Sequence, residues 1–262
     1  MGVWQQLRQR SVIVADGIVE RFDEQLLDAF LAFLTEQNVA GGFFSAKDSD
    51  RILERHLYES IVLVDEITRR LDIGCNHIDR SGIARNSIAR SSCRVADVGS
   101  GPGLPGAVFG CLHDPPPLTL IDSSRRRLGL VETHLAAQLP TTRFLYRRVE
   151  ELRGKETDGV ATLFDVVVAR ALAPYPYSVE LIARTVAPGG HIVLATAGTL
   201  TAPAGAPKLR DLGFERVAEV RLEDLAFLGE RHLLYLRRCG TPRRGYPRSW
   251  SVIQAEIRRA RS

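Results

Sequence analysis

The hydrophobic positions in the first third of the chain recur at helical spacing. Residues 18–38 place apolar side chains three and four positions apart, which predicts an amphipathic helix that Gly41-Gly42 ends. A second helical pattern runs over residues 49–71. Residues 72–92 are rich in Gly, Asn, Ser and Arg and show little periodicity, so we interpret them as a linker.

From Arg94 onward, short apolar runs alternate with helical stretches. Five runs have the composition of buried strands: 95–98, 118–121, 144–146, 164–168 and 191–195. Helical patterns at about 124–139 and 178–187 lie between them, and 214–221 and 231–237 look like two strands of an antiparallel edge. Buried strands that alternate with crossover helices predict an α/β fold with a doubly wound, mainly parallel sheet and helices on both faces.

These patterns divide the chain into three parts. We expect an N-terminal helical cap and linker over 1–92, an α/β domain over 93–240 and a basic C-terminal tail over 241–262. The tail contains a short amphipathic pattern at 250–257, which predicts a helix able to dock on the body or on a partner. We expect this tail to be mobile when its partner is absent.

The composition is that of an ordinary globular protein. Of the 262 residues, 45% are hydrophobic and 25% are charged, which excludes a disordered or fibrous chain. No apolar run approaches the roughly 18–20 residues that span a bilayer, and the N-terminus lacks the pattern of a signal peptide. We therefore expect a soluble cytoplasmic protein without a membrane partner.

The four cysteines and six histidines show no metal-ligand spacing. The cysteines lie far apart and form no C-x-x-C pair, and the histidines are scattered. We expect free thiols in a reducing compartment and no metal site.

The charge is distributed unevenly along the chain. The net charge is +4, yet residues 231–262 hold nine arginines and a single acidic residue, Glu256. A basic end on a neutral-to-acidic body favours an anionic partner, nucleic acid before membrane. A solvated tail in an arginine-rich protein explains the charge alone equally well.

The strongest chemical signal is a glycine-rich loop directly after the first strand, Asp97-Val98-Gly99-Ser100-Gly101-Pro102-Gly103-Leu104-Pro105-Gly106. Gly99 and Gly101 permit a tight turn, and Gly103 permits close approach of a ligand. Counted from Gly99, the third glycine of the dinucleotide fingerprint falls on Leu104, so the loop departs from that fingerprint. Taken alone, it is also compatible with an ordinary strand-to-helix turn.

Three further signals follow the next strands. Asp122 ends the second strand and can accept both ribose hydroxyls of a nucleoside, although Asp122, Ser123 or Ser124 can also cap a helix. Val149-Glu150-Glu151 lies where an adenine ring would lie, or forms the acidic first turn of a helix. Arg170 closes the fourth strand with a fixed cation, or pairs with a nearby carboxylate. Because all these signals fall at carboxyl ends of successive strands, we favour a cleft for an adenosyl cofactor.

In this order the motifs resemble the bacterial 16S ribosomal RNA guanine-N7 methyltransferase family, also called glucose-inhibited division protein B. The resemblance covers about residues 25–248. Besides the loop and the three signals, it is carried by Glu54-Arg55-His56-Leu57-Tyr58-Glu59-Ser60, residues 164–171, Ala187-Pro188-Gly189-Gly190, Glu230-Arg231-His232-Leu233 and residues 241–248. The resemblance implies a Rossmann-like class I methyltransferase with an antiparallel sheet edge and an N-terminal helical segment.

The resemblance also implies S-adenosylmethionine as the cofactor. The residues expected to bind it are Asp97, Gly99, Gly101, Gly103, Leu104, Asp122, Ser123, Val149, Glu150 and Arg170. Arg170 would lie at the methionine or substrate end and act in catalysis, and His56 would act there or orient the site. Guanine N7 has an exposed lone pair and no proton, so its methylation needs alignment with the methyl group and no general base.

The expected partner is 16S ribosomal RNA or the small ribosomal subunit, bound by a monomer. Arg125, Arg126 and Arg127 can contact RNA phosphates, and deleting residues 241–262 should weaken RNA binding while affinity for the cofactor stays within a few-fold. Thr196-Ala197-Gly198 stands where the family usually has Leu-Lys-Gly. This departure keeps open a paralogue that N-methylates a small heteroaromatic molecule. A third hypothesis, from a different class, is a nucleic-acid-binding or regulatory protein that binds the cofactor without turnover.

Overall fold

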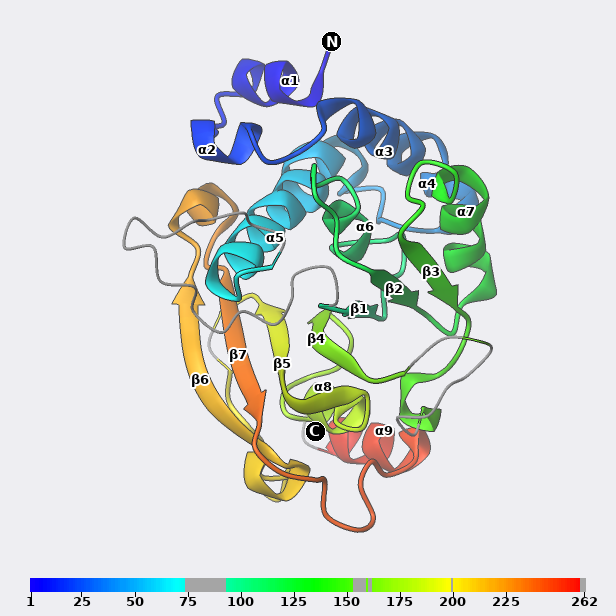
Figure 1. Cartoon of the computed structure of the whole chain (residues 1–262), viewed down its shortest axis with the longest axis vertical. Helices are drawn as coiled ribbons and strands as arrows, with labels where there is room; N and C mark the ends of the chain where they lie inside the picture. The colour runs from blue at the N-terminus through cyan, green and yellow to red at the C-terminus, as the bar shows by residue number, and fades with distance from the viewer. Residues whose placement is uncertain (74–92, 153–158, 160–161, 199, 260–262) are drawn as a thin grey trace.

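The seven strands of the described residues form one sheet in the order β3-β2-β1-β4-β5-β7-β6 (Figure 1). The computed structural model describes residues 1–73, 93–152, 159, 162–198 and 200–259. The strands are β1 Val95–Val98, β2 Leu118–Ile121, β3 Thr142–Leu145, β4 Phe164–Arg170, β5 Val186–Thr196, β6 Phe214–Arg221 and β7 His232–Arg238. β1 to β5 pair in parallel, whereas β7 is antiparallel to both β5 and β6. The predicted mixed α/β fold is confirmed.

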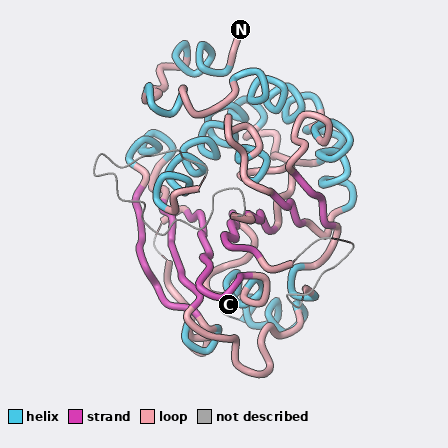
Figure 2. Tube along the Cα trace, viewed as in Figure 1, coloured by secondary structure: helices cyan, strands magenta, loops and turns pink. Residues whose placement is uncertain are grey.

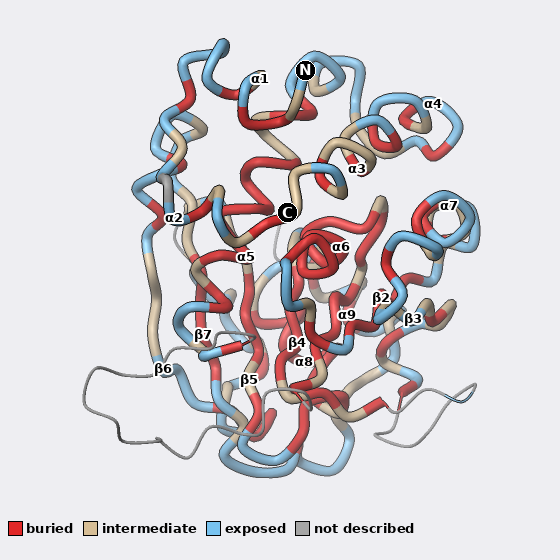
Figure 3. The backbone as a smooth tube through the Cα atoms, turned by 45° about the horizontal axis from the view of Figure 1, so that its top comes forward, coloured by how far each residue is buried: buried red, intermediate tan, exposed pale blue. Residues whose placement is uncertain are grey.

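Helices cover both faces of this sheet, and in the view of Figure 2 they lie above and below the strands. The helices are α1 Val3–Gln9, α2 Asp16–Val19, α3 Glu24–Glu36, α4 Asn38–Gly41, α5 Glu59–Arg70, α6 Gly106–Phe109, α7 Arg125–Leu135, α8 Tyr177–Ile182 and α9 Trp250–Arg259. Val166 and Val168 of β4 face one hydrophobic cluster, while Val167 and Ala169 face the other. This alternation follows from the two-residue period of a strand. It explains why the buried positions of Figure 3 concentrate in the central strands and the helices beside them.

The first predicted helix is wrong in its extent, because residues 18–38 do not form one helix. Phe22 is buried and pairs as an isolated bridge with Leu112. Asp23 then begins α3 as its N-cap, its carboxylate accepting hydrogen bonds from the backbone N–H groups of Gln25 and Leu26 at 2.9 and 3.2 Å. The cap and the bridge break a pattern whose periodicity is otherwise continuous.

The second helical pattern is confirmed, although it changes its winding along the way. A 3-10 turn over Ser49–Arg51 leads into a π-helix over Ile52–Tyr58, which continues as α5. The π-helix carries most of the motif around His56, and π-turns occur often at functional sites. The remainder of the predicted linker, residues 74–92, lies outside the described residues, as does Cys75.

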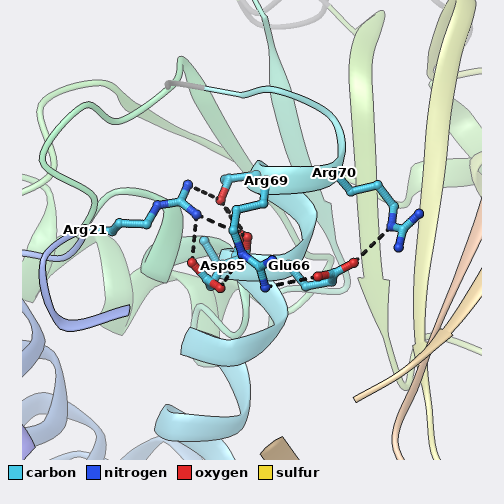
Figure 4. Close-up of polar contacts among 7 residues, drawn as sticks. Arg21, Asp65, Glu66, Arg69 and Arg70 are labelled. Atoms are coloured by element: carbon cyan, nitrogen blue, oxygen red, sulfur yellow. Dashed lines mark hydrogen bonds and ion pairs between the residues drawn. The ribbon is translucent and has the colours of Figure 1, made fainter. Parts of the chain in front are cut away.

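An ion-pair cluster on α5 fixes the segment around Arg21 to this helix (Figure 4). Arg21 donates to the buried Asp65 carboxylate at 2.7 Å and to Thr68 Oγ1 at 2.7 Å. Arg69 pairs with the same carboxylate at 2.8 Å. Since one buried carboxylate holds two guanidinium groups, the segment before α3 is fixed on α5 by charge as well as by apolar packing.

The helix predicted over 178–187 is shorter than expected. α8 ends at Ile182, and β5 already begins at Val186. β5 pairs Val186 with Phe164, bulges through Pro188-Gly189-Gly190 and resumes pairing at His191. The Pro-Gly-Gly sequence therefore forms a bulge within β5 and does not end a helix.

The C-terminal segment packs on the body, so the expectation of a mobile tail is wrong for its described residues. Ile253 and Ile257 of α9 are buried against the same cluster as α8. The Glu180 side chain on α8 has no exposed surface. Its two carboxylate oxygens accept hydrogen bonds from Arg248 Nε at 2.9 Å and from Arg248 Nη2 at 2.8 Å. Residues 260–262, with Arg261, lie outside the described part. The domain boundaries at 92 and 240 stay a prediction.

Candidate functional site

A cleft of about 680 Å³ lies over the carboxyl ends of the strands. Its wall includes the ends of β1, β2, β4 and β5, the residues that follow β3, the start of β7 and one side of the π-helix and α5. The predicted residues that line it are Gly99, Gly101, Leu104, Asp122, Ser123, Val149, Glu150, Arg170 and His56. All four sequence signals therefore meet in one cavity, whose size is that of a small-molecule site.

The glycine-rich loop presents its backbone to this cleft. Gly99, Gly101 and Gly103 have φ angles of 73, 55 and 92°, in the left-handed region that side chains other than glycine rarely adopt. The Gly101 N–H donates to Asp122 Oδ2 at 2.8 Å. A Cβ added to Gly101 would meet nothing nearer than 3.9 Å, so the loop backbone faces open space at this point.

Two residues expected to bind the cofactor lie outside the cleft wall. Asp97 is fully buried, and neither it nor Gly103 lines the cavity. Burial raises the pKa of Asp97 to about 7, although the Gly106 N–H, which donates to Oδ2 at 2.8 Å, acts in the opposite direction. Asp97 Oδ1 has no hydrogen-bond partner among the described residues. In this structure Asp97 supports the loop from beneath.

Gly106 is a residue that the sequence reasoning missed. A Cβ at this position would lie 2.4 Å from Leu120 Cδ2 and 2.5 Å from Asp97 Cβ. The start of α6 therefore touches the strands at a distance that only glycine allows. Counted from Gly101, the loop reads Gly101-x-Gly103-x-x-Gly106, which is the complete fingerprint displaced by two residues. The fingerprint is therefore present in the sequence, but it is missed when the glycines are counted from Gly99.

We expect Gly106→Ala to lower the free energy of unfolding by about 1–3 kcal/mol, the usual cost of overpacking a core. It should also weaken cofactor binding, because Asp97 and the loop must shift. Chemical denaturation and calorimetric titration with S-adenosylhomocysteine measure both effects. The matched control is Gly129→Ala in α7, where a Cβ meets nothing nearer than 3.9 Å. This variant should raise the free energy of unfolding by as much as about 1 kcal/mol. Equal stability of the two variants would contradict the close contact.

The two roles predicted for Asp122, Ser123 and Ser124 fall to different residues. Asp122 and Ser123 line the cleft, whereas Ser124 caps the helix that follows. Asp122 is buried, and its Oδ1 accepts from the Ser124 N–H at 2.7 Å while Oδ2 holds the loop. Ser124 is the N-cap of α7 and accepts from the Arg127 N–H at 3.3 Å. Each carboxylate oxygen retains a second lone pair for a ligand hydroxyl. Arg127 points back into the cleft wall and lies 3.7 Å from Asp122.

The end of the cleft beyond β3 contains a residue that sequence reasoning did not assign to the site, Trp250. Val149–Glu151 forms a 3-10 turn with Val149 buried, and Arg148 donates to the Glu150 carboxylate at 2.6 Å. The Arg148 guanidinium lies 5.8 Å from the centre of the Trp250 ring, and both residues line the cavity. Because Trp250 comes from α9, the C-terminal segment completes this end of the cleft.

The opposite end of the cleft is charged. The Arg170 guanidinium, 18% exposed, lies 3.8 Å from Glu59 Oε2 and donates to Ser60 Oγ at 3.3 Å. Arg231 donates to Glu59 Oε1 at 2.7 Å. Burial lowers the pKa of Arg170, whereas the carboxylates of Glu59 and Asp97 raise it. The predicted carboxylate partner of Arg170 thus exists, and both groups line the cavity.

His56 forms an aromatic part of the wall. Its ring stacks on Phe44 with the centroids 4.0 Å apart and the planes 17° apart. Burial first and the Arg170 charge second lower the pKa of His56 to about 4. Its imidazole is therefore neutral at neutral pH. His56 Nε2 has no hydrogen-bond partner within the described residues.

The described residues contain neither a metal-binding cluster nor a helix that could span a membrane. No three His, Cys, Asp or Glu side chains gather there in a way that could hold a metal ion. Cys93, Cys111 and Cys239 are free thiols. None of the described helices is long and apolar enough to cross a membrane.

Comparison with known proteins gives concordant results. The family GidB, described as rRNA small subunit methyltransferase G, matches residues 23–203. A ribosomal RNA small subunit methyltransferase G of Leptospira interrogans is 33% identical over 260 residues, which cover 98% of this chain and 93% of the relative. The corresponding protein of Leptospira biflexa is 34% identical over 90% of this chain and 89% of its own.

Solved structures share the fold at low sequence identity. A point mutant of MtNAS, solved in complex with S-adenosylmethionine, superposes with a TM-score of 0.51 at 16% identity over 82% of this chain and 72% of its own. The 1,6-didemethyltoxoflavin-N1-methyltransferase of Burkholderia thailandensis, solved with S-adenosylhomocysteine, gives a TM-score of 0.50 at 16% identity over 80% of this chain and 88% of its own. These likenesses concern the fold alone.

Proposed function

This chain belongs to the rRNA small subunit methyltransferase G family, and on that premise we propose that it methylates N7 of a guanine in 16S ribosomal RNA, with S-adenosylmethionine as the methyl donor. The observation that carries the proposal is the single cleft in which the glycine loop, Asp122, Val149-Glu150 and Arg170 meet. The cleft presents carboxylates and backbone N–H groups near the loop and a guanidinium at its far end. This combination suits a nucleoside that carries both positive and negative charges.

The fit to the cofactor rests on three groups of residues. Gly99, Gly101 and Leu104 would bound the methionine part, where the loop backbone faces open space. Asp122 would accept the ribose hydroxyls through its remaining lone pairs. Val149 and Glu150 would border the adenine, with Ser123 beside them on the wall. Asp97 and Gly103 would act from behind by holding the loop.

The chemistry asks the protein to orient the base and exclude water. When bound, S-adenosylmethionine supplies an electrophilic methyl group. Guanine N7 carries no proton, so no side chain has to remove one. The neutral imidazole of His56, stacked on Phe44, would provide a flat surface against which the base can pack. Arg170 is the fixed donor that would hold the guanine O6 next to N7.

The partner follows from the family and from the rim of the cleft. Arg55, Arg127 and Arg148 line the cavity with side chains about 42% exposed, so their guanidinium groups can reach phosphates of an RNA strand. Of the three arginines that begin α7, only Arg127 lines the cleft. A ribosomal substrate implies action in the cytoplasm by a protein that works without a membrane, and we propose that it acts as a monomer.

Fluorescence reports on the adenine end directly, because the chain has only two tryptophans, Trp4 and Trp250. Trp4 is 3% exposed in α1, whereas Trp250 lines the cleft. S-adenosylhomocysteine should change the emission of the wild type and of Trp4→Phe, because an adenine beside Val149 would contact the indole. Trp250→Phe should lose the response. A response that persists in Trp250→Phe would place the adenine elsewhere.

The direct test of the proposed function uses tritiated S-adenosylmethionine. The protein is incubated with small ribosomal subunits from a strain lacking the endogenous modification, and the label is mapped by nuclease digestion. Label on one guanine, with the depurination-prone behaviour of an N7-methyl base, is the expected result. Cofactor binding without transfer to RNA would refute it and favour the heteroaromatic substrate or the regulatory role.

A further inference from the structure

The cleft is longer than a cofactor bound as proposed would require. It runs from the end of β3, through β2, β1, β4 and β5, to the start of β7. Neighbouring strands lie about 4.8 Å apart, so this edge measures about 24 Å. The proposed adenine, ribose and methionine positions use β3, β2 and β1. The part of the cleft facing β4, β5 and β7 is left for the substrate base.

A donor and an acceptor lie side by side in that part. Arg170 Nη1 is a fixed donor, and Glu59 Oε2 lies 3.8 Å away, too far for a hydrogen bond between them. Glu59 Oε1 accepts from Arg231 Nε at 2.7 Å, which fixes the orientation of the carboxylate. The Glu59 side chain is 10% exposed and lines the cavity. An ionised carboxylate has about four lone-pair sites, so both oxygens can accept again.

The donor on Arg170 and the acceptor on Glu59 match the hydrogen-bonding pattern of guanine and are the reverse of what adenine requires. Around the guanine ring, N7, the O6 acceptor, the N1–H donor and the N2 amino donor follow one another. Adenine presents an amino donor at position 6 and an acceptor at N1, the reverse pattern. A base whose O6 accepts from Arg170 therefore turns N1–H and the amino group toward Glu59, with N7 on the side of the cofactor.

We infer that Glu59 recognises the target guanine, accepting hydrogen bonds from its N1–H and N2 amino group, and so determines specificity for guanine. The inference rests on the proposed function, because it requires a base in this cleft. Transfer of the methyl group places positive charge on the guanine ring, and a carboxylate at the ring edge stabilises that charge. Glu59 is thus a specificity group in direct contact with the substrate. A purely structural role, neutralising Arg170 and Arg231, makes a different prediction.

The test compares Glu59→Gln with the wild type on two RNAs. Once the labelled guanine has been mapped, small-subunit RNA is prepared with guanine or inosine at that position and reconstituted. Inosine keeps N7, O6 and N1–H and lacks only the amino group. The wild type should prefer guanine about 10-fold in single-turnover rate. Glu59→Gln should lose about 10- to 100-fold on guanine and should not prefer guanine over inosine, because its amide presents a donor toward the amino group.

A matched control lies on the same helix. Glu66 pairs with Arg70 at 2.9 Å and with Arg69 at 3.1 Å, much as Glu59 pairs with Arg231, but Glu66 does not line the cavity (Figure 4). Glu66→Gln should keep the wild-type preference. S-adenosylhomocysteine should bind Glu59→Gln within about threefold of the wild type.

Each outcome separates the two claims. Loss of rate on both RNAs by the same factor, or a change below threefold, overturns the role of Glu59 and leaves the proposed function intact. Absence of RNA methylation by the wild type overturns the proposed function itself. Reduced cofactor affinity in Glu59→Gln would assign the residue to the cofactor end and also overturn the inference.

Discussion

Arg248→Met is expected to lower the free energy of unfolding by about 3–5 kcal/mol, because it leaves the Glu180 carboxylate buried without a counter-charge. Glu180 has no exposed surface, and Arg248 gives it two side-chain bonds and one backbone bond, each 2.8–2.9 Å long. The same guanidinium also pairs with Glu256 of α9 at 2.5 Å. Chemical denaturation monitored by circular dichroism measures the loss.

Two controls make this prediction specific. Arg258→Met changes an exposed arginine of α9 and should alter stability by no more than about 0.5 kcal/mol. Glu180→Leu combined with Arg248→Met removes both charges and should be more stable than Arg248→Met alone. A single variant as stable as the wild type would show that the pair contributes nothing.

The same contacts change how the tail should be tested. Deleting residues 241–262, as the sequence suggested, would remove Arg248, Trp250 and the buried face of α9 together. We expect such a deletion to damage both the fold and the cofactor end of the cleft. The prediction that it leaves cofactor affinity nearly unchanged does not follow from this structure. Substitution of exposed arginines is the better probe of RNA binding.

Arg170→Ala should reduce the methylation rate by about 100- to 1,000-fold, the range found when a preorganised donor at a reacting group is removed. The guanidinium lines the cleft and lies 3.8 Å from Glu59 Oε2. Glu59 keeps its bond to Arg231 at 2.7 Å, so the fold should persist. Single-turnover labelling of small ribosomal subunits measures the rate, and thermal denaturation checks the fold.

The control for Arg170→Ala is a surface arginine. Arg221 is 53% exposed, pairs with Glu223 at the end of β6 and does not line the cavity. Arg221→Ala should keep the wild-type rate. Arg170→Lys retains the charge but lacks the planar fork, so it should recover only part of the activity. Wild-type turnover in Arg170→Ala would remove this residue from the site.

The sequence predicted the central sheet well because buried strands carry their signal locally. All five runs read as parallel strands are strands, and the motifs at their carboxyl ends meet in one cleft. Topology explains this success, since parallel strands bring their carboxyl ends to the same edge.

Several of the failures have a different cause, namely contacts between distant segments. The break at Phe22 depends on a bridge to Leu112, and the wall at Trp250 depends on α9 docking beside α8. The acceptor beside Arg170 is Glu59, which lies far away in the sequence. The amphipathic pattern at 250–257 indicated a helix but not where it packs, and the carboxylate expected beside Arg170 could not be identified, because hydrophobic periodicity contains no information about such pairings.

The position of Trp250 and Arg248 near the end of the chain has a consequence for biosynthesis. Translation delivers every strand and the glycine loop before it delivers these two residues. Until then the Glu180 carboxylate lacks the counter-charge of Arg248, and the cleft lacks the part of its wall that Trp250 forms. A nascent chain that has not yet reached Arg248 therefore contains the sheet and the glycine loop but lacks this part of the proposed cofactor site.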